Sequence, residues 1–533
     1  MRSRTAQDSA TWIPQMEEIG VRSIRSGMTI WGAVQPTEDR FDFAKLDEQL
    51  TYFEQHGLSS GALLNGNASW NSLDKGDVLP VHNLPAWSKY VSELARHIRG
   101  RVKRFEVWNE PPNGTGKDQT PADYAKVVVA AYDAAKAVDP TNMIGLATKS
   151  ADLNYLDLAL QSGAKDHFDW ITLHPYEILG GVADLAGTEA VYMNIVPSVR
   201  KMLTARDPEK KEVPIVFTEI GCDAGSKGPE RQAWTLVKAY TMGIAQGVAC
   251  IDWFEGRDGD SGPMGLIDAK GEKRPAYVAL AQMIKHLGQH PQYVGWVKLS
   301  GKHYGFVFQG AQGPVLIAWS YRKSTGEVTF PKPVPVVNLL TGQVTELDRA
   351  TLSPEPIMVL NPPEELLQKA RVNAGKPLDW GGDFTQAKSV SIAWGDHQTT
   401  ESGLHSLDGE SVAQDVVAYG GSARAGGVPG GNLFVVDPGF LSYTSTPIEI
   451  TVVVRRNEAN DNAGFNLIYE STTGLKASRS GWYTVPDNKE WHTVKFQIDD
   501  PQFVNYWGYN FSFNSDGPKF SKYYLQSVTV TKK

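Results

Sequence analysis

The sequence contains very little cysteine: only Cys222 and Cys250 occur among its 533 residues. Two cysteines cannot build the disulfide framework of a small secreted scaffold, and by themselves they cannot form a cysteine-based zinc site. No apolar run approaches the roughly 20 residues that a membrane-spanning helix needs. We therefore expect no disulfide scaffold and no membrane span.

The chain also lacks an excess of positive charge. Lysine and arginine number 52 against 60 aspartate and glutamate residues, which gives a net charge of −8. A protein that binds nucleic acid normally carries a basic surplus to neutralise phosphates, so we expect no nucleic-acid partner. Hydrophobic residues make up 41% and charged residues 21%, which excludes wholesale disorder. The 15 tryptophans and 20 tyrosines favour a protein that presents flat rings to a ligand.

The first 288 residues alternate between short β-branched runs and amphipathic helical patterns. In residues 85–98, Trp87, Tyr90, Val91 and Leu94 follow the spacing of one buried helix face. Such alternation predicts repeated βα units and an α/β barrel. The strands are expected at 21–26, 59–65, 104–109, 143–148, 169–174, 214–220 and 248–254.

These strands are one fewer than a closed (β/α) barrel needs. The absent strand should precede a helix at about 11–19, but residues 1–9 carry almost no apolar side chains and would make a poor buried strand. We therefore predict a TIM barrel that lacks its first strand or is truncated there.

The pattern becomes all-β after the barrel. Residues 289–362 read as a small domain of short strands separated by turns, and residues 363–377 as a linker. Residues 378–533 read as one larger β-sandwich. The domain prediction is thus a catalytic barrel over 1–288, a small β domain, a linker and a sandwich.

Two glutamates end two of the predicted barrel strands. Glu110 follows Asn109 in FEVWNEPPNG, where Pro111 ends the ladder of hydrogen bonds. Glu219 closes the apolar run VPIVFTEIG, where an unpartnered carboxyl would cost several kcal/mol to bury. Both should lie at the rim of a parallel barrel, where reacting groups sit. A carboxyl pair is what glycosidic bond cleavage requires, because one protonates the leaving oxygen and the other attacks or activates water.

Several blocks resemble the strand ends of clan A glycoside hydrolases, with families 39 and 5 the most similar. They are GVRSIRSGMTIWGAVQPTEDRFDFAKLD at 20–47, EVWNEP at 106–111, ITLHPY at 171–176, VFTEIG at 216–221 and DWFEG at 252–256. The resemblance implies a TIM barrel, net retention of anomeric configuration, Glu110 as acid/base from the fourth strand and Glu219 as nucleophile from the seventh. It implies no cofactor and no metal.

The resemblance also assigns substrate-binding roles to Arg25, Trp31, Asn109, His174, Tyr176 and Trp253. Arg25 should point toward Glu219 and keep that carboxylate ionised. His174 would tune the acid or contact substrate, with a satisfied core histidine as the alternative. Trp253 would form the floor beneath the sugar.

The C-terminal sandwich resembles carbohydrate-binding jelly rolls. Trp482 and Trp507 are its candidate sugar-stacking residues, and burial in the core is the alternative for these rings. Asp499, Asp500 and the stretch 457–462 could hold a structural calcium ion, but their spacing fits no loop signature, and solvated turns are the favoured interpretation.

Both cysteines are predicted to be free thiols. Cys222 lies three residues after Glu219, and Cys250 lies three before Trp253. If Glu219 and Trp253 are level, the two sulfurs are roughly 20 Å apart along neighbouring strands. A disulfide requires Cα atoms within about 7 Å.

The sequence therefore predicts a retaining glycosidase that cleaves β-glycosidic bonds in an oligo- or polysaccharide. A catalytically silent carbohydrate-binding protein is the alternative from another class, and an inverting enzyme or a transglycosylase is a third. Neither the sugar, the linkage, exo or endo action nor the oligomeric state can be read from the motifs. A carbohydrate substrate leads us to expect a secreted or periplasmic protein, without a signal peptide in this chain.

Overall fold

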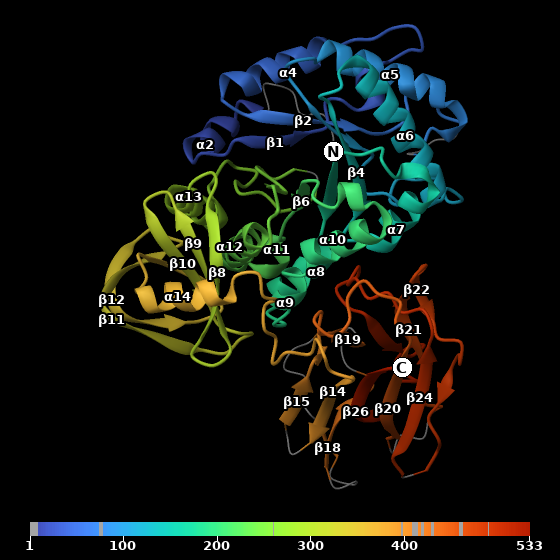
Figure 1. The fold of residues 1–533 in the computed structure, drawn as a ribbon, viewed down its shortest axis with the longest axis vertical. Coiled ribbons are helices and arrows are strands. Elements are labelled where there is room, and N and C mark those ends of the chain that lie inside the picture. The colour runs from blue at the N-terminus through green and yellow to red at the C-terminus, as the bar shows by residue number, and fades with distance from the viewer. Residues whose placement is uncertain are drawn as a thin grey trace. The chain divides into compact units, whose positions relative to one another are not determined.

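The computed structural model describes residues 9–533 except 74–77, 260, 396–397, 408–413, 417–420, 428–430, 458–461 and 489. Its internal contacts divide the chain into two compact units (Figure 1). One unit contains the chain up to Leu179 together with Val199–Gly375, and the other contains Gly180–Ser198 together with Lys376–Lys533. The barrel and the small β domain therefore share one unit, while the sandwich forms the second with a segment inserted in the barrel sequence.

Seven parallel strands form the barrel sheet, and each pairs with the next along the chain. They are β1 (Ser23–Ser26), β2 (Ser59–Leu64), β3 (Arg104–Val107), β4 (Met143–Lys149), β5 (Trp170–His174), β6 (Ile215–Ile220) and β7 (Cys250–Trp253). All seven predicted strands are confirmed. Within the described residues no strand precedes β1, and the sheet order ends at β1 and β7 without pairing them. The barrel is nearly closed, and β1 takes the place of a second barrel strand.

Side chains at the start of the described chain line a cavity together with residues of the two end strands. Helix α2 (Ile13–Glu18) follows Trp12 and buries Ile13 and Met16. Trp12 and Met16 line a cavity of about 160 Å³ together with Ile24 of β1 and Ile251 of β7. A helix and its flanking aromatic ring thus lie beside the two strands that end the sheet.

The barrel helices follow the predicted amphipathic pattern. Helix α5 (Leu84–His97) buries Trp87 and Tyr90, and helix α6 (Pro121–Val138) begins with a capping box between Thr120 and Asp123. The other main barrel helices are α4 (Ala44–Gln55), α7 (Leu153–Ala159), α8 (Tyr176–Ala183), α10 (Ile195–Arg206), α12 (Pro229–Ala245) and α13 (Pro275–Leu287). In the described part of the chain, none of the helices is both long and apolar enough to cross a membrane.

The small β domain is one antiparallel sheet in the order β12-β11-β13-β10-β9-β8. Its strands are β8 (Gln292–Leu299), β9 (His303–Gly310), β10 (Gly313–Trp319), β11 (Gly326–Asn338), β12 (Val344–Leu352) and β13 (Ile357–Leu360). The stretch predicted as a linker contains helix α14 (Glu364–Asn373). Leu367 and Ala370 of α14 are buried in the core of this domain, so the helix is part of it.

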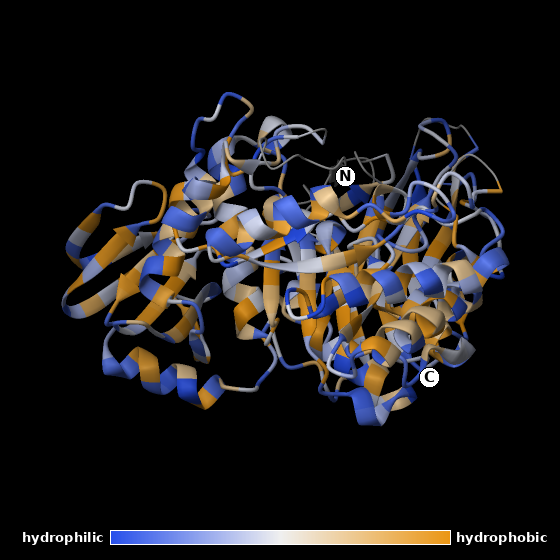
Figure 2. Ribbon diagram, turned by 90° about the horizontal axis from the view of Figure 1, so that it is seen from above, coloured by the Kyte–Doolittle hydropathy of each residue, from blue (hydrophilic) through white to orange (hydrophobic). Residues whose placement is uncertain are grey.

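The sandwich consists of two antiparallel sheets, as predicted. One has the order β15-β14-β26-β18-β17 with β20 and β24 attached through β26, and the other has the order β16-β19-β25-β21-β22 with β23 attached to β21. The bounds are β14 (Ser389–Gly395), β15 (Gln398–Ser402), β16 (Leu404–Ser406), β17 (Gln414–Val416), β18 (Gly421–Ala425), β19 (Asn432–Val436), β20 (Ile448–Arg456), β21 (Gly464–Ser471), β22 (Gly474–Ala477), β23 (Tyr483–Thr484), β24 (His492–Ile498), β25 (Phe511–Asn514) and β26 (Tyr523–Lys532). Figure 2 shows hydrophobic residues concentrated on strands and hydrophilic ones on loops.

Candidate active site

Glu110 lies just beyond the end of β3, on a backbone that turns sharply. Trp108 and Glu110 both adopt left-handed conformations, with φ of 68° and 50°. The amide of Asn109 between them donates to Asn65 Oδ1 at 3.0 Å. Non-glycine residues adopt this conformation at a cost that the surroundings must offset, and such positions cluster at functional sites. The turn places the Glu110 carboxyl, 21% exposed, at the carboxyl end of the sheet.

Glu219 lies within β6, and its carboxylate is 13% exposed. Arg25 of β1 donates from Nη1 to Glu219 Oε1 at 2.5 Å, as the sequence predicted. The Tyr176 hydroxyl donates to Glu219 Oε2 at 3.3 Å. Two donors from two other elements therefore fix the orientation of this carboxylate.

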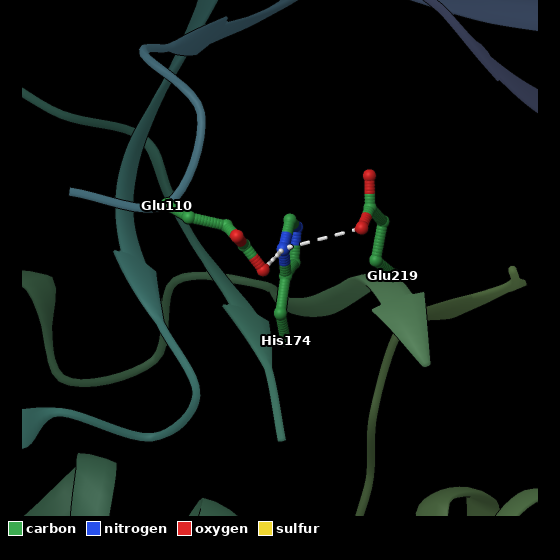
Figure 3. A group of neighbouring side chains, drawn as sticks. All are labelled: Glu110, His174 and Glu219. Carbon is green, nitrogen blue, oxygen red and sulfur yellow. Dashed lines mark hydrogen bonds and ion pairs between the residues drawn. The ribbon is translucent and has the colours of Figure 1, made fainter. Parts of the chain in front are cut away.

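His174, at the end of β5, lies between the two glutamates (Figure 3). Its Nδ1 is 2.9 Å from Glu110 Oε1 and 3.7 Å from Glu219 Oε2. One ligand atom from each of these three side chains lies within 4.8 Å of the others. The structure thus brings together both carboxyls and the histidine that the sequence placed on three separate strands.

The surroundings shift the pKa values of Glu110 and Tyr176 in opposite directions. Burial acts to raise the pKa of Glu110, but His174, with smaller contributions from Asn113 and Arg25, outweighs burial, and the net effect lowers that pKa. Burial first, and then the Glu219 charge, raise the pKa of Tyr176 well above its ordinary value. Tyr176 therefore stays protonated and remains a hydrogen-bond donor.

Glu106 is a site residue that the sequence reasoning missed. It lies on β3, and its carboxylate forms a buried ion pair with Arg25, with the Arg25 Nε 2.8 Å from Glu106 Oε2. The Thr218 hydroxyl donates to Glu106 Oε1 at 3.3 Å and also lies 2.9 Å from His174 Nε2. A carboxyl in the middle of an apolar strand, RFEV, was the signal that could have identified it.

Trp31 does not fit the substrate-binding role predicted for it. Its ring is fully buried, stacks on Tyr90 at 5.3 Å and donates its N–H to Gln35 Oε1 at 2.7 Å. This aromatic packing removes the ring from contact with a ligand. Trp253, in contrast, ends β7 half-buried and lines the same cavity as Glu219.

Asn109 uses its side-chain oxygen within the protein. Its Oδ1 accepts a hydrogen bond from Arg25 Nη2 at 2.7 Å. This contact fixes the Asn109 side chain. In the predicted role, the side-chain amide nitrogen would therefore be the atom that binds the sugar hydroxyl.

Glu110, His174 and Glu219 also form a set of side chains that could ligate a metal ion. The carboxylate of Glu219 is already paired with the Arg25 guanidinium through Oε1, while Oε2 faces His174. A cation so close to the carboxylate disfavours a second positive charge at the same oxygens. The donor set therefore fits acid–base chemistry better than metal binding.

The carboxylates considered for calcium in the sandwich are paired with cations. Asp500 lies 2.6 Å from Lys476 Nζ and accepts from the Tyr469 hydroxyl at 2.8 Å. Asp499 lies 3.1 Å from Arg479 Nη1. These pairings agree with ordinary turn carboxylates rather than calcium ligands. Of the other candidate stretch, residues 458–461 lie outside the described residues.

Both cysteines are free, as predicted. Cys250 is paired in register with Val216 of β6. Val216 precedes Cys222 by six residues in the sequence. The strand geometry therefore separates the two sulfurs in the way the sequence implied.

The barrel carries glutamates at the ends of β3 and β6, the arrangement that the sequence resemblance to clan A glycoside hydrolases implied. Residues 15–251 match the model of glycosyl hydrolases family 39. A curated relative, a beta-xylosidase from Caldicellulosiruptor saccharolyticus, is 25% identical over 249 residues, which cover 40% of this chain and 49% of that protein. The chain thus spans about half the length of this relative.

A solved structure supports the fold independently. A family 39 glycoside hydrolase from the gut symbiont Bacteroides cellulosilyticus WH2 matches with a TM-score of 0.56 at 18% identity, over 66% of this chain and 77% of that one. Together these matches confirm the resemblance to clan A glycoside hydrolases.

Proposed function

We propose that the protein is a retaining glycoside hydrolase in which Glu110 is the acid/base and Glu219 the nucleophile. The observation that carries this proposal is the approach of the two carboxyls, whose oxygens come within 4.8 Å. Retaining enzymes hold their carboxyls about 5–5.5 Å apart, whereas inverting enzymes leave about 6.5–9.5 Å for a water molecule. The short separation favours double displacement over inversion.

The contacts of each carboxyl support its role. Glu219 is held by Arg25 through Oε1, so Oε2 attacks the anomeric carbon and forms a glycosyl ester. Glu110 gives its proton to the departing glycosidic oxygen as that bond breaks. In the second step Glu110 takes a proton from water, which attacks the same carbon and releases Glu219. Trp253 provides an aromatic face in the same cavity.

The name of the curated relative supports a substrate class for this chain. Because that protein is a beta-xylosidase, β-linked xylosides are the substrates to test first. The chemistry is carried by two carboxyls and needs no cofactor. Aryl β-glycosides of several sugars, followed by oligosaccharides, would define which sugar the site accepts.

The test is the variant Glu219→Ala on an activated aryl glycoside. Loss of the nucleophile should lower kcat/KM by at least ~10³-fold, because the covalent route is closed. Added azide should restore turnover by attacking the anomeric carbon in the vacated space, giving a glycosyl azide of inverted configuration. The control is Glu93→Ala, which removes a carboxylate of a solvent-exposed ion pair with Arg96.

Three results would reject parts of this proposal. Full activity in Glu219→Ala removes Glu219 as nucleophile. Product of inverted configuration from the unmodified protein rejects double displacement. No turnover of any glycoside, with sugar binding retained, supports the silent carbohydrate-binding protein instead.

We also propose that the sandwich binds carbohydrate, on the observation that Trp507 is exposed. Among the described residues of the sandwich it is the large hydrophobic side chain with the greatest exposure, at 40%. Tyr506 lies beside it, with ring centroids 4.6 Å apart. Adjacent aromatic faces at a loop surface suit stacking against sugar rings. Trp482 is half-buried and packs edge-on against Phe520 at 5.7 Å, which makes it the weaker candidate.

A further inference from the structure

The buried ion pair between Arg25 and Glu106 has the geometry of a two-pronged fork. The Arg25 Nε donates to Glu106 Oε2 at 2.8 Å, and Nη2 donates to Glu106 Oε1 at 2.9 Å. The two side chains are 8% and 5% exposed. We propose that Glu106 is a positioning residue for the reaction: it holds the guanidinium so that the nucleophile receives only one N–H group. The inference rests on the proposed function of Glu219.

The distribution of the Arg25 donors supports this role. A guanidinium carries five N–H groups. Two go to Glu106, one on Nη2 goes to Asn109 Oδ1 at 2.7 Å, and one on Nη1 goes to Glu219 Oε1 at 2.5 Å. The other oxygen of Glu219, Oε2, instead faces the Tyr176 hydroxyl at 3.3 Å. The nucleophile is thereby ion-paired through one oxygen while the second points at the reacting position.

Loss of the Glu106 charge would change the preferred partner of Arg25. Arginine pairs most strongly with a carboxylate through two parallel hydrogen bonds. With Glu106 neutral, Glu219 becomes the carboxylate in direct contact with the guanidinium. Arg25 would then turn to hold both Glu219 oxygens, which withdraws electron density from Oε2 and blocks its approach to the sugar.

Glu106 is itself held from a second side, which makes it a rigid support. The Thr218 hydroxyl donates to Glu106 Oε1 at 3.3 Å and the Thr172 hydroxyl at 3.5 Å. Other titratable or charged groups that face Arg25 and its two partners in the barrel interior include Glu110, His174, Tyr176, Asp252, Arg104 and Tyr124. Burial raises the pKa of Asp252 to about 6.

The variant Glu106→Gln tests the proposal with two measurements. Its crystal structure should show Arg25 within hydrogen-bond distance of both Glu219 oxygens, which requires no substrate. In kinetics, kcat/KM for an aryl glycoside should fall about 10²-fold, because the attacking oxygen is misplaced. The acidic limb of the kcat/KM profile should move to lower pH. Arg25 would no longer share its charge with Glu106 and would favour the ionised form of Glu219 more strongly.

Asp157→Asn is the matched control. Asp157 is also 5% exposed and also accepts two N–H groups of one arginine, from Arg206 Nε at 2.5 Å and Nη2 at 3.1 Å, but it lies on α7. This control removes a forked ion pair whose carboxylate is equally buried, although the Arg206 side chain is 39% exposed, and it should lower thermal stability without moving the acidic limb. If both variants lose stability but only Glu106→Gln shifts the acidic limb, the shift reflects an effect on Glu219 and not the loss of stability.

The outcomes distinguish this inference from the proposed function. Wild-type turnover that is lost in Glu219→Ala but unchanged in Glu106→Gln leaves the function standing and overturns the positioning role. An Arg25 that remains on one oxygen of Glu219 in the Glu106→Gln structure also overturns it, whether or not any glycoside is hydrolysed. A glycosidase that retains activity in Glu219→Ala rejects the proposed function instead.

Discussion

Glu110 and His174 are joined by a hydrogen bond of 2.9 Å between Oε1 and Nδ1, and the histidine is 1% exposed. Its other nitrogen lies 2.9 Å from the Thr218 hydroxyl, so both ring nitrogens have partners inside the protein. The ring is therefore fixed in place, with Nδ1 facing the Glu110 carboxyl. His174 favours the ionised form of the Glu110 carboxyl, the group that we propose as the acid.

The first prediction follows from the direction of the Glu110 pKa shift. Burial acts to raise that pKa, and His174 lowers it below its ordinary value. A general acid must be protonated, so activity falls as pH rises through its pKa. His174→Ala removes the lowering influence, and the basic limb of the kcat/KM profile should move to higher pH. Substrates with poor leaving groups should show this most clearly, because they depend on the proton.

Tyr176→Phe is the comparison variant for this prediction. Its hydroxyl donates to Glu219 rather than to Glu110. This substitution replaces one neutral group by another, so the basic limb should stay in place even though the rate falls. The basic limb of the kcat/KM profile of His174→Ala could instead remain in place or move to lower pH. Either result would show that His174 does not govern the ionisation of Glu110.

The positions of the barrel strands were predictable because each is a short β-branched or apolar run bounded by helical periodicity. The two glutamates of the candidate site were predictable because a carboxyl ends such a run at the rim. Glu106 was missed because it lies inside its strand, where the alternation of side chains, and not a motif, decides that it points inward. Its partner Arg25 comes from a strand 81 residues earlier, and sequence spacing does not show that pairing.

Trp31 and helix α14 show where local pattern failed. Trp31 follows a predicted strand, as a rim residue would, but it begins the short helix α3 (Trp31–Val34), which turns the ring into a cluster with Tyr90 and Trp87. Residues 363–377 have a linker-like composition, yet Leu367 and Ala370 lie on one face of a helix that packs against the small β domain. In both cases tertiary burial decided the outcome.

Thiol counting provides a second prediction. Both cysteines should react with a thiol reagent in denaturant without reductant, giving two thiols per chain. In the folded protein the reaction should be slow, because Cys222 is buried and burial raises the pKa of Cys250 to about 11, which depletes the thiolate. Fewer than two reactive thiols in denaturant would reveal a disulfide that the strand register does not allow.

The third prediction concerns the sandwich. Trp507→Ala should weaken retention on an insoluble or gel-embedded polysaccharide about tenfold, because the ring is the exposed stacking surface. Affinity electrophoresis measures this, with the same gel lacking polysaccharide as the control. Turnover of a small aryl glycoside should be unchanged in the same variant. Equal retention of both proteins on every polysaccharide tested would reject Trp507 as a binding residue.

The loop that carries Trp507 is held by a buried carboxylate, Glu470, which is 1% exposed. Its Oε2 accepts from the amides of Val504 and Asn505, each at 3.0 Å, and from Asn510 Nδ2 at 2.8 Å. Its Oε1 accepts from the Tyr506 amide at 2.6 Å. Every one of these partners is a donor, so the site is built for an acceptor at both oxygens.

Glu470→Gln should therefore destabilise the sandwich although it changes the side-chain shape very little. The new amide group must point at least one N–H toward a backbone donor. Because burial raises the pKa of Glu470 to about 7, the substitution also removes, above that pH, the charge that strengthens the remaining bonds. We expect a loss of about 2–4 kcal/mol in the free energy of unfolding, measured by denaturant titration. Asp499→Asn, which weakens an exposed pair with Arg479, should cost under about 0.5 kcal/mol. If the two variants are equally stable, Glu470 does not hold this loop, and Trp507 must owe its position to other contacts.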